Sequence, residues 1–259
     1  MRALAALVGI LIFAHPAGAQ GTAVDIELAF VVDASGSIDT AETRLQRQGY
    51  ADALKNPQVL SSIAGGLTGG IAVAYIEFAA DGCERLSVPW TRIHDLASAA
   101  AFGERILALP PVFCPGGNAI GDALAFAAGS IQNNAFSGAR RVIDLSGDGP
   151  NTVGGAVEPV RDLIVASGIT INGLVIDRPS MPNLDAYFRG NMTGGPGSFV
   201  IKAESRETFG AAILKKMILE IAGDPADSPH PGPPPQGGRE ENRAETKSSP
   251  LAGEDLGGG

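Results

Sequence analysis

The feature that most constrains the fold is a recurring alternation of apolar runs with segments that carry helix signals. The runs are short and continuously apolar, which is typical of strands that are buried on both faces. We predict strands at residues 24–32, 71–80, 85–90, 141–145, 169–176 and 198–202. We predict helices at residues 39–55, 59–64, 96–109, 119–132, 157–166 and 207–222, with a short helical turn at 184–188.

This alternation predicts an α/β fold of the doubly wound, Rossmann-like kind, with a mostly parallel central sheet and helices on both faces. The Asp81-Gly82 pair indicates a hairpin, so residues 85–90 are expected to form one antiparallel edge strand. Pro89 is tolerated there because an edge strand need not donate every hydrogen bond. Ligands of such sheets bind beyond the carboxyl ends of the strands, so functional residues are expected at that edge.

The two ends of the chain differ in composition from its middle. Residues 1–19 combine Arg2, an apolar stretch and the small-residue motif Ala17-Gly18-Ala19, which is typical of a cleavable signal peptide. An uncleaved membrane anchor is the alternative, but the apolar stretch is shorter than the roughly 20 residues that span a bilayer. Residues 224–259 are dense in Pro and Gly and poor in apolar residues, so we predict a disordered tail after a folded domain at 20–223.

Charge and targeting limit the partners that the chain could have. A formal net charge of −9 argues against nucleic acid, which requires basic patches. No membrane span is predicted in the mature chain, so we expect a periplasmic or secreted protein. Export allows Cys83 and Cys114 to form a disulfide, with two free thiols as the alternative.

Candidate metal ligands follow two of the predicted strands. Asp33, Ser35 and Ser37 come directly after strand 24–32, and Asp148 follows strand 141–145. Carboxylate and hydroxyl oxygens are the ligands that hard divalent cations such as Mg²⁺ prefer. Taken singly, each residue has a simpler explanation, since Ser and Asp between a strand and a helix are most often helix caps.

The pattern Asp-x-Ser-x-Ser after the first strand, with Asp-Gly after the fourth, resembles the von Willebrand factor A (vWA) family. That resemblance implies a metal site in which Ser35 and Ser37 coordinate directly and Asp33 and Asp148 act through water. The third loop of the family usually supplies a threonine, and Asn118 stands at the matching position here. Asn can offer its carbonyl oxygen to a cation, although it can also serve as a helix cap.

Further motifs are similar to a bacterial exported subgroup of the vWA family, a domain family of unknown function. These motifs lie at residues 143–151, 171–174, 194–199 and 216–221, and the resemblance as a whole covers about residues 24–223. The cofactor that the resemblance implies is a divalent cation, Mg²⁺ foremost, with Mn²⁺ or Ca²⁺ possible. The implied function is adhesion-type binding, in which the cation takes a carboxylate from a protein partner.

An enzyme is the rival class of function, and the sequence offers little for it. The mature chain holds only His94 and His230, and no Gly-x-Ser-x-Gly motif is present for a serine hydrolase. The glycine clusters lack the Gly-Lys-Ser/Thr of a phosphate-binding loop. We therefore predict no catalytic residues, and we interpret Asp144, inside a strand, as structural. A degenerate vWA scaffold that binds its partner without metal remains the alternative function, because of Asn118. A hydrolase that uses Asp33 and Asp148 as paired carboxylates is a less favoured alternative, because the adjacent serines indicate metal binding instead.

Overall fold

The structure is a computed structural model that describes residues 21–111, 116–205 and 207–223. The predicted signal peptide at 1–19 and the predicted tail at 224–259 lie outside the described residues. Within the described ranges, no helix is both long enough and apolar enough to cross a membrane.

Six strands of the described chain form one sheet in the order β3-β2-β1-β4-β5-β6. They are β1 Thr22–Asp33, β2 Ile71–Phe78, β3 Arg85–Ile93, β4 Phe136–Gly147, β5 Thr170–Ile176 and β6 Val200–Ala203. Neighbouring strands are parallel throughout, except that β3 pairs antiparallel with β2 at the edge. The predicted mostly parallel sheet with one antiparallel edge strand is therefore confirmed.

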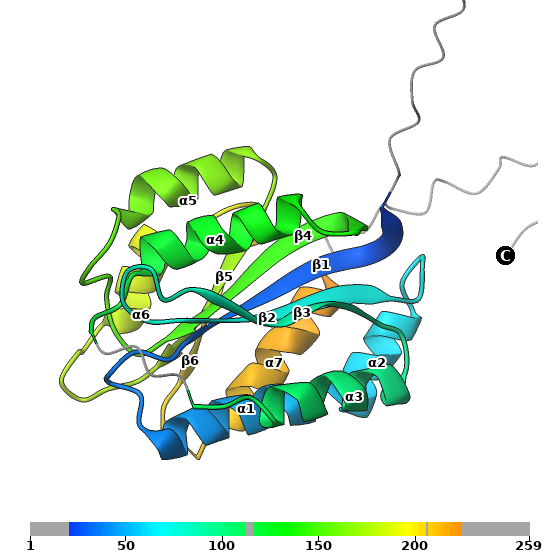
Figure 1. Cartoon of the computed structure of the whole chain (residues 1–259), viewed down its shortest axis with the longest axis horizontal. Coiled ribbons are helices and arrows are strands. Elements are labelled where there is room, and N and C mark those ends of the chain that lie inside the picture. Colours follow the sequence, from blue (N-terminus) through cyan, green and yellow to red (C-terminus); the bar gives the residue numbers. More distant parts are fainter. Residues whose placement is uncertain (1–20, 112–115, 206, 224–259) are drawn as a thin grey trace, which may run out of the picture. The chain divides into compact units, whose positions relative to one another are not determined.

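Helices cover both faces of this sheet, as predicted. The helices are α1 Thr40–Leu54, α2 Pro57–Ala64, α3 Leu96–Leu107, α4 Ile120–Gln132, α5 Val157–Ala166, α6 Leu184–Tyr187, the π-helix η1 Phe188–Met192 and α7 Phe209–Ala222. Figure 1 shows α4 and α5 on one face and α1, α2, α3 and α7 on the other. The described core is accordingly divided into two apolar layers, one on each side of the sheet.

The sequence of β1 is apolar at successive positions because this strand lies in the middle of the sheet, with helices on both faces. Leu28, Phe30 and Val32 pack into the layer beneath α1, α3 and α7, whereas Ala29 and Val31 pack into the layer beneath α4 and α5. A strand that is covered on both faces must be apolar at successive positions. Burial of each large side chain stabilises the fold by roughly 1.5–3 kcal/mol. These buried residues hold β1 in the sheet, and the polar loop begins where they end.

The strand β4 is longer than the sequence predicts. It begins at Phe136 instead of residue 141, and its first half pairs with the start of β1. That half is partly exposed and contains Ser137 and Gly138, so it lacks the continuous apolar run on which the prediction rested. Its backbone pairing is reinforced by Glu27, whose Oε1 accepts a hydrogen bond from the Gly138 N–H at 2.7 Å.

A charged cluster lies inside the layer beneath α7. The Lys216 ammonium on α7 is fully buried and lies 2.8 Å from Asp144 Oδ1 on β4, and it also pairs with Glu220. Asn172 on β5 donates to Glu220 at 3.0 Å, and the Tyr50 hydroxyl donates to Asp144 at 3.2 Å. These contacts agree with the predicted structural role of Asp144. Burial, followed by the charge of Asp144, raises the pKa of Glu220 to about 8.

Candidate metal centre

The loop after β1 folds back over the carboxylate with which the strand ends. The Ser35 N–H donates to Asp33 Oδ1 at 2.8 Å, and the Ser35 and Ser37 hydroxyl oxygens lie 3.1 Å apart. Asp33 and Ser35 are buried, with 1% and 2% of their surface exposed, whereas Ser37 is exposed. The three predicted residues of this loop thus form one oxygen cluster that opens to solvent at Ser37.

Asp148 joins this cluster from the neighbouring strand. The Ser37 hydroxyl donates to Asp148 Oδ1 at 2.9 Å, although the two residues are 111 positions apart in the sequence. They meet because β1 and β4 are parallel neighbours that end at the same edge of the sheet. Asp148 is 1% exposed, so its carboxylate is enclosed by the two loops.

The electrostatics of Asp33 favour a cation nearby. Its Oδ2 is buried and makes no hydrogen bond. Burial of the side chain, and next the charge of Asp148, raise the pKa of Asp33 from 3.8 to about 7. A Cβ on Gly147 would lie 3.3 Å from this Oδ2, so the glycine leaves the carboxylate room. A positive ion would offset both the lost solvation and the repulsion between the carboxylates.

Asn118 lies beside the same loops, immediately before α4. It is 6% exposed, and its side-chain nitrogen lies 2.9 Å from the position that a Cβ on Gly149 would take. Its backbone is held by Thr152, whose Oγ1 accepts from the Asn118 N–H at 2.8 Å and whose own N–H donates to the Asn118 carbonyl at 2.9 Å. The third predicted loop is thereby tied to the segment that follows Asp148.

Helix capping does not account for these polar residues. The N-terminus of α1 is capped by Asp39 and Glu42, which form a capping box with hydrogen bonds of 2.8 and 3.0 Å. At α4 no side chain caps from the N-cap position, and Asn151 Oδ1 instead accepts from the Ile120 N–H at 2.7 Å. The interpretation of Ser35, Ser37 and Asn118 as caps is therefore wrong in this structure.

Arg178, which follows β5, also contacts this cluster, although no motif in the sequence singles it out. One guanidinium nitrogen, Nη2, forms an ion pair with Asp148 Oδ2 and donates to the Ser37 carbonyl at 2.8 Å. The same nitrogen lies 3.7 Å from Glu42 Oε2. Position was the only signal in the sequence, because Arg178 is a charged residue just beyond the carboxyl end of a predicted parallel strand.

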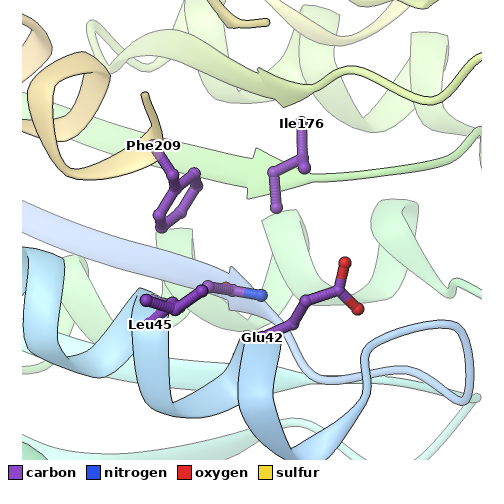
Figure 2. Close-up of a pocket in the computed structure, with 5 residues that line it drawn as sticks. Glu42, Leu45, Ile176 and Phe209 are labelled. Atoms are coloured by element: carbon purple, nitrogen blue, oxygen red, sulfur yellow. The ribbon is translucent and has the colours of Figure 1, made fainter. Parts of the chain in front are cut away.

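Glu42 links the site to a small pocket on the adjoining face of α1. The pocket has a volume of about 10 Å³ and is lined by Glu42, Leu45, Gln46, Ile176 and Phe209. Figure 2 shows the Glu42 carboxylate on the Ile176 side of this pocket, away from the Phe209 ring. The buried amide of Gln46 makes no hydrogen bond with protein, and the volume is close to that of one water molecule.

The donor set fits a hard divalent cation. In the described part of the chain, no group of three or more His, Cys, Asp or Glu side chains could hold a metal ion. The candidate site instead combines two carboxylates, Asp33 and Asp148, with the hydroxyls of Ser35 and Ser37 and the amide of Asn118. All are oxygen donors of the kind that Mg²⁺, Mn²⁺ and Ca²⁺ accept. The unpartnered Asp33 Oδ2 is the observation that supports this fit most directly.

His94 lies apart from this cluster, and of the predicted Cys83–Cys114 pair only Cys83 lies among the described residues. His94 follows β3, whose end pairs with the start of β2, so it lies at the opposite end of the sheet from Ser35. Cys83 lies in the turn before β3, whereas Cys114 falls outside the described residues. The Cys83–Cys114 disulfide therefore stays a prediction, which two titratable thiols in the non-reduced protein would contradict.

Solved structures with the same fold include adhesion and matrix proteins. Proximal thread matrix protein 1 from the mussel byssus is 20% identical over 78% of this chain and 47% of its own, with a TM-score of 0.54, and one of its structures has a zinc-occupied MIDAS motif. The pilus adhesin SpaC from Lactobacillus rhamnosus GG is 16% identical over 78% of this chain and 32% of its own, with a TM-score of 0.56. This chain thus spans less than half of either protein.

A third neighbour matches over nearly its whole length. The vWF domain of the type V pili tip protein Mfa5 from Porphyromonas gingivalis is 12% identical over 78% of this chain and 97% of its own, with a TM-score of 0.56. These likenesses establish the vWA fold that the sequence motifs indicated. No curated protein matches the chain. A family model described as protein of unknown function (DUF1194) matches residues 23–225, and the chain therefore belongs to that family.

Proposed function

We propose that this chain is an exported binding protein that recognises an acidic group of a protein partner through a divalent cation. The cation would be held by Ser35, Ser37 and Asn118, with Asp33 and Asp148 supplying the negative charge. Mg²⁺ is the foremost candidate, because the donors are hard oxygens and no sulfur or imidazole is among them. Mn²⁺ and Ca²⁺ accept the same donors.

The unpartnered, buried oxygen of Asp33 carries this proposal. A buried carboxylate oxygen without a hydrogen bond is costly, and the neighbouring charge of Asp148 adds to the cost. A bound cation would supply the missing interaction. Ser37, the exposed member of the cluster, marks the side from which a partner's carboxylate would approach.

The neighbours support a binding role over an enzymatic one. They are a pilus adhesin, a pilus tip protein and a byssus matrix protein, and the last has been solved with zinc in its MIDAS motif. Residues 1–19 are consistent with export to the periplasm or the exterior, where such a role would be exercised. The alternative is a scaffold that binds its partner without metal.

Calorimetric titration of Mg²⁺, Mn²⁺ and Ca²⁺ into the exported chain tests the proposal. We expect saturable binding in the wild type and none in Asp33→Ala, which should keep its fold because the strand pairing of β1 does not depend on that side chain. Asp52→Ala is the matched control, since Asp52 is an exposed carboxylate on α1. Absence of binding for all three ions in the wild type would contradict the proposal and favour the metal-free scaffold.

A further inference from the structure

The Arg178 guanidinium occupies the carboxylate on which the candidate metal site depends. It forms an ion pair with Asp148 Oδ2, and the other oxygen of this carboxylate accepts from Ser37 at 2.9 Å. Both oxygens of Asp148 are therefore engaged within the protein. The Arg178 side chain is 28% exposed and the Asp148 side chain 1%, so a partly exposed arginine contacts a buried carboxylate.

The same guanidinium connects three elements around the site. Nη2 donates to the Ser37 carbonyl at 2.8 Å, so it holds the β1 loop as well as Asp148. It also lies 3.7 Å from Glu42 on α1, which places a second carboxylate within reach if the contact with Asp148 is lost. Arg178 could thus leave Asp148 by a small movement without losing all of its charge compensation.

We propose that Arg178 is the resident cation of this site, which a divalent ion must displace from Asp148. The inference rests on the proposed metal function. A guanidinium carries one positive charge and neutralises only one of the two carboxylates, Asp33 and Asp148. A divalent ion carries two charges, so its electrostatic attraction to the pair of carboxylates is stronger than that of the arginine. Arg178 also repels a second cation at close range. It therefore lowers the affinity of the site for metal and sets the concentration at which metal binds.

The sign of this effect separates competition from a supporting structural role. If Arg178 competes with metal, Arg178→Gln should bind Mn²⁺ about tenfold more tightly than the wild type, the order expected for loss of one charge-assisted contact. Arg178→Lys keeps the charge but not the forked geometry, so its Mn²⁺ affinity should lie between those of the wild type and Arg178→Gln. If Arg178 only supported the loops, its removal would weaken binding.

The experiment is Mn²⁺ titration of the full exported chain, wild type and variants, with thermal midpoints recorded to verify folding. Arg105→Gln is the control, because it makes the same change of charge at an exposed arginine that bonds Thr91, at the far end of the sheet. Tighter binding in Arg178→Gln with an unchanged Arg105→Gln supports the proposal. Equal or weaker binding in Arg178→Gln overturns it and leaves the metal site standing, whereas no binding in any protein overturns the metal function as well.

A second readout needs no substitution in the protein that is measured. The Nε of Arg178 is buried and makes no hydrogen bond, so its N–H signal in a nitrogen-15 spectrum reports directly on the surroundings of this side chain. Arg178→Lys identifies the signal by its absence. Saturation with Mg²⁺ should shift this signal and leave that of Arg105 in place. An unmoved Arg178 signal at metal saturation would overturn the displacement.

Discussion

Replacing Asp33 by Asn should stabilise the metal-free protein while it abolishes metal binding. Asp33 is buried, and burial together with the charge of Asp148 raises its pKa from 3.8 to about 7. A carboxyl group with a raised pKa binds its proton more tightly in the folded state than in the unfolded state. The stability of the metal-free wild type must therefore fall as the pH rises from about 4 to about 7.

The size of the effect follows from that pKa change. One pKa unit corresponds to about 1.4 kcal/mol, so the ionised Asp33 costs the folded state at most about 4 kcal/mol above pH 7. In Asp33→Asn the oxygen that accepts from the Ser35 N–H is retained, but the new NH₂ takes the place of the unpartnered Oδ2. An unsatisfied buried donor costs about 1–3 kcal/mol. We therefore expect a net gain of about 1–3 kcal/mol.

The assay is urea unfolding of both proteins at pH 5 and pH 8, in the presence of EDTA and then of Mg²⁺. In EDTA the advantage of Asp33→Asn should be larger at pH 8 than at pH 5. In Mg²⁺ the wild type should gain stability by mass action and Asp33→Asn should not. A variant no more stable than the wild type at pH 8 in EDTA would refute the assigned cost of the Asp33 charge.

Three further predictions concern the buried cluster and the third loop. Lys216→Met should lower the free energy of unfolding at pH 8 by about 3–5 kcal/mol, because it leaves Asp144 and Glu220 buried without their cation; a loss below about 1 kcal/mol in urea unfolding would contradict this. Glu220 has a raised pKa, so ionisation destabilises the fold as the pH rises from about 4.5 to about 8, and Glu220→Gln should flatten this part of the pH–stability curve; an unchanged slope would count against it. Asn118→Ala should weaken Mg²⁺ binding about tenfold through loss of one ligand, with little change in the melting temperature; unaltered calorimetric affinity would exclude Asn118 from the site.

The fold could be predicted because the informative residues are contiguous. Leu28, Phe30 and Val32 alternate with Ala29 and Val31, and both sets are apolar because both faces of β1 are covered. The first half of β4 gave no such signal, since it is half-exposed and is ordered by pairing with β1. Tertiary pairing, not local composition, sets the start of that strand.

The candidate site could be predicted only in part, for a similar reason. Asp33, Ser35 and Ser37 lie within five consecutive positions, and Asp148 follows a strand that a parallel sheet brings to the same edge. Arg178 could not be placed, because its bond to Ser37 joins residues 141 positions apart through a loop without regular structure. The burial of Lys216 and Glu220 was equally hidden, since charges four residues apart on a helix usually face solvent.

Diffraction from crystals of the exported chain soaked in Mn²⁺ tests the central claim most directly, because manganese can be located by its anomalous scattering. We predict one strong peak within coordination distance of Ser35 Oγ, Ser37 Oγ and the side-chain oxygen of Asn118, beside the carboxylates of Asp33 and Asp148, with Arg178 moved off Asp148 Oδ2. Soaking at millimolar Mn²⁺ that leaves no peak among these residues, or places the ion elsewhere, would contradict it.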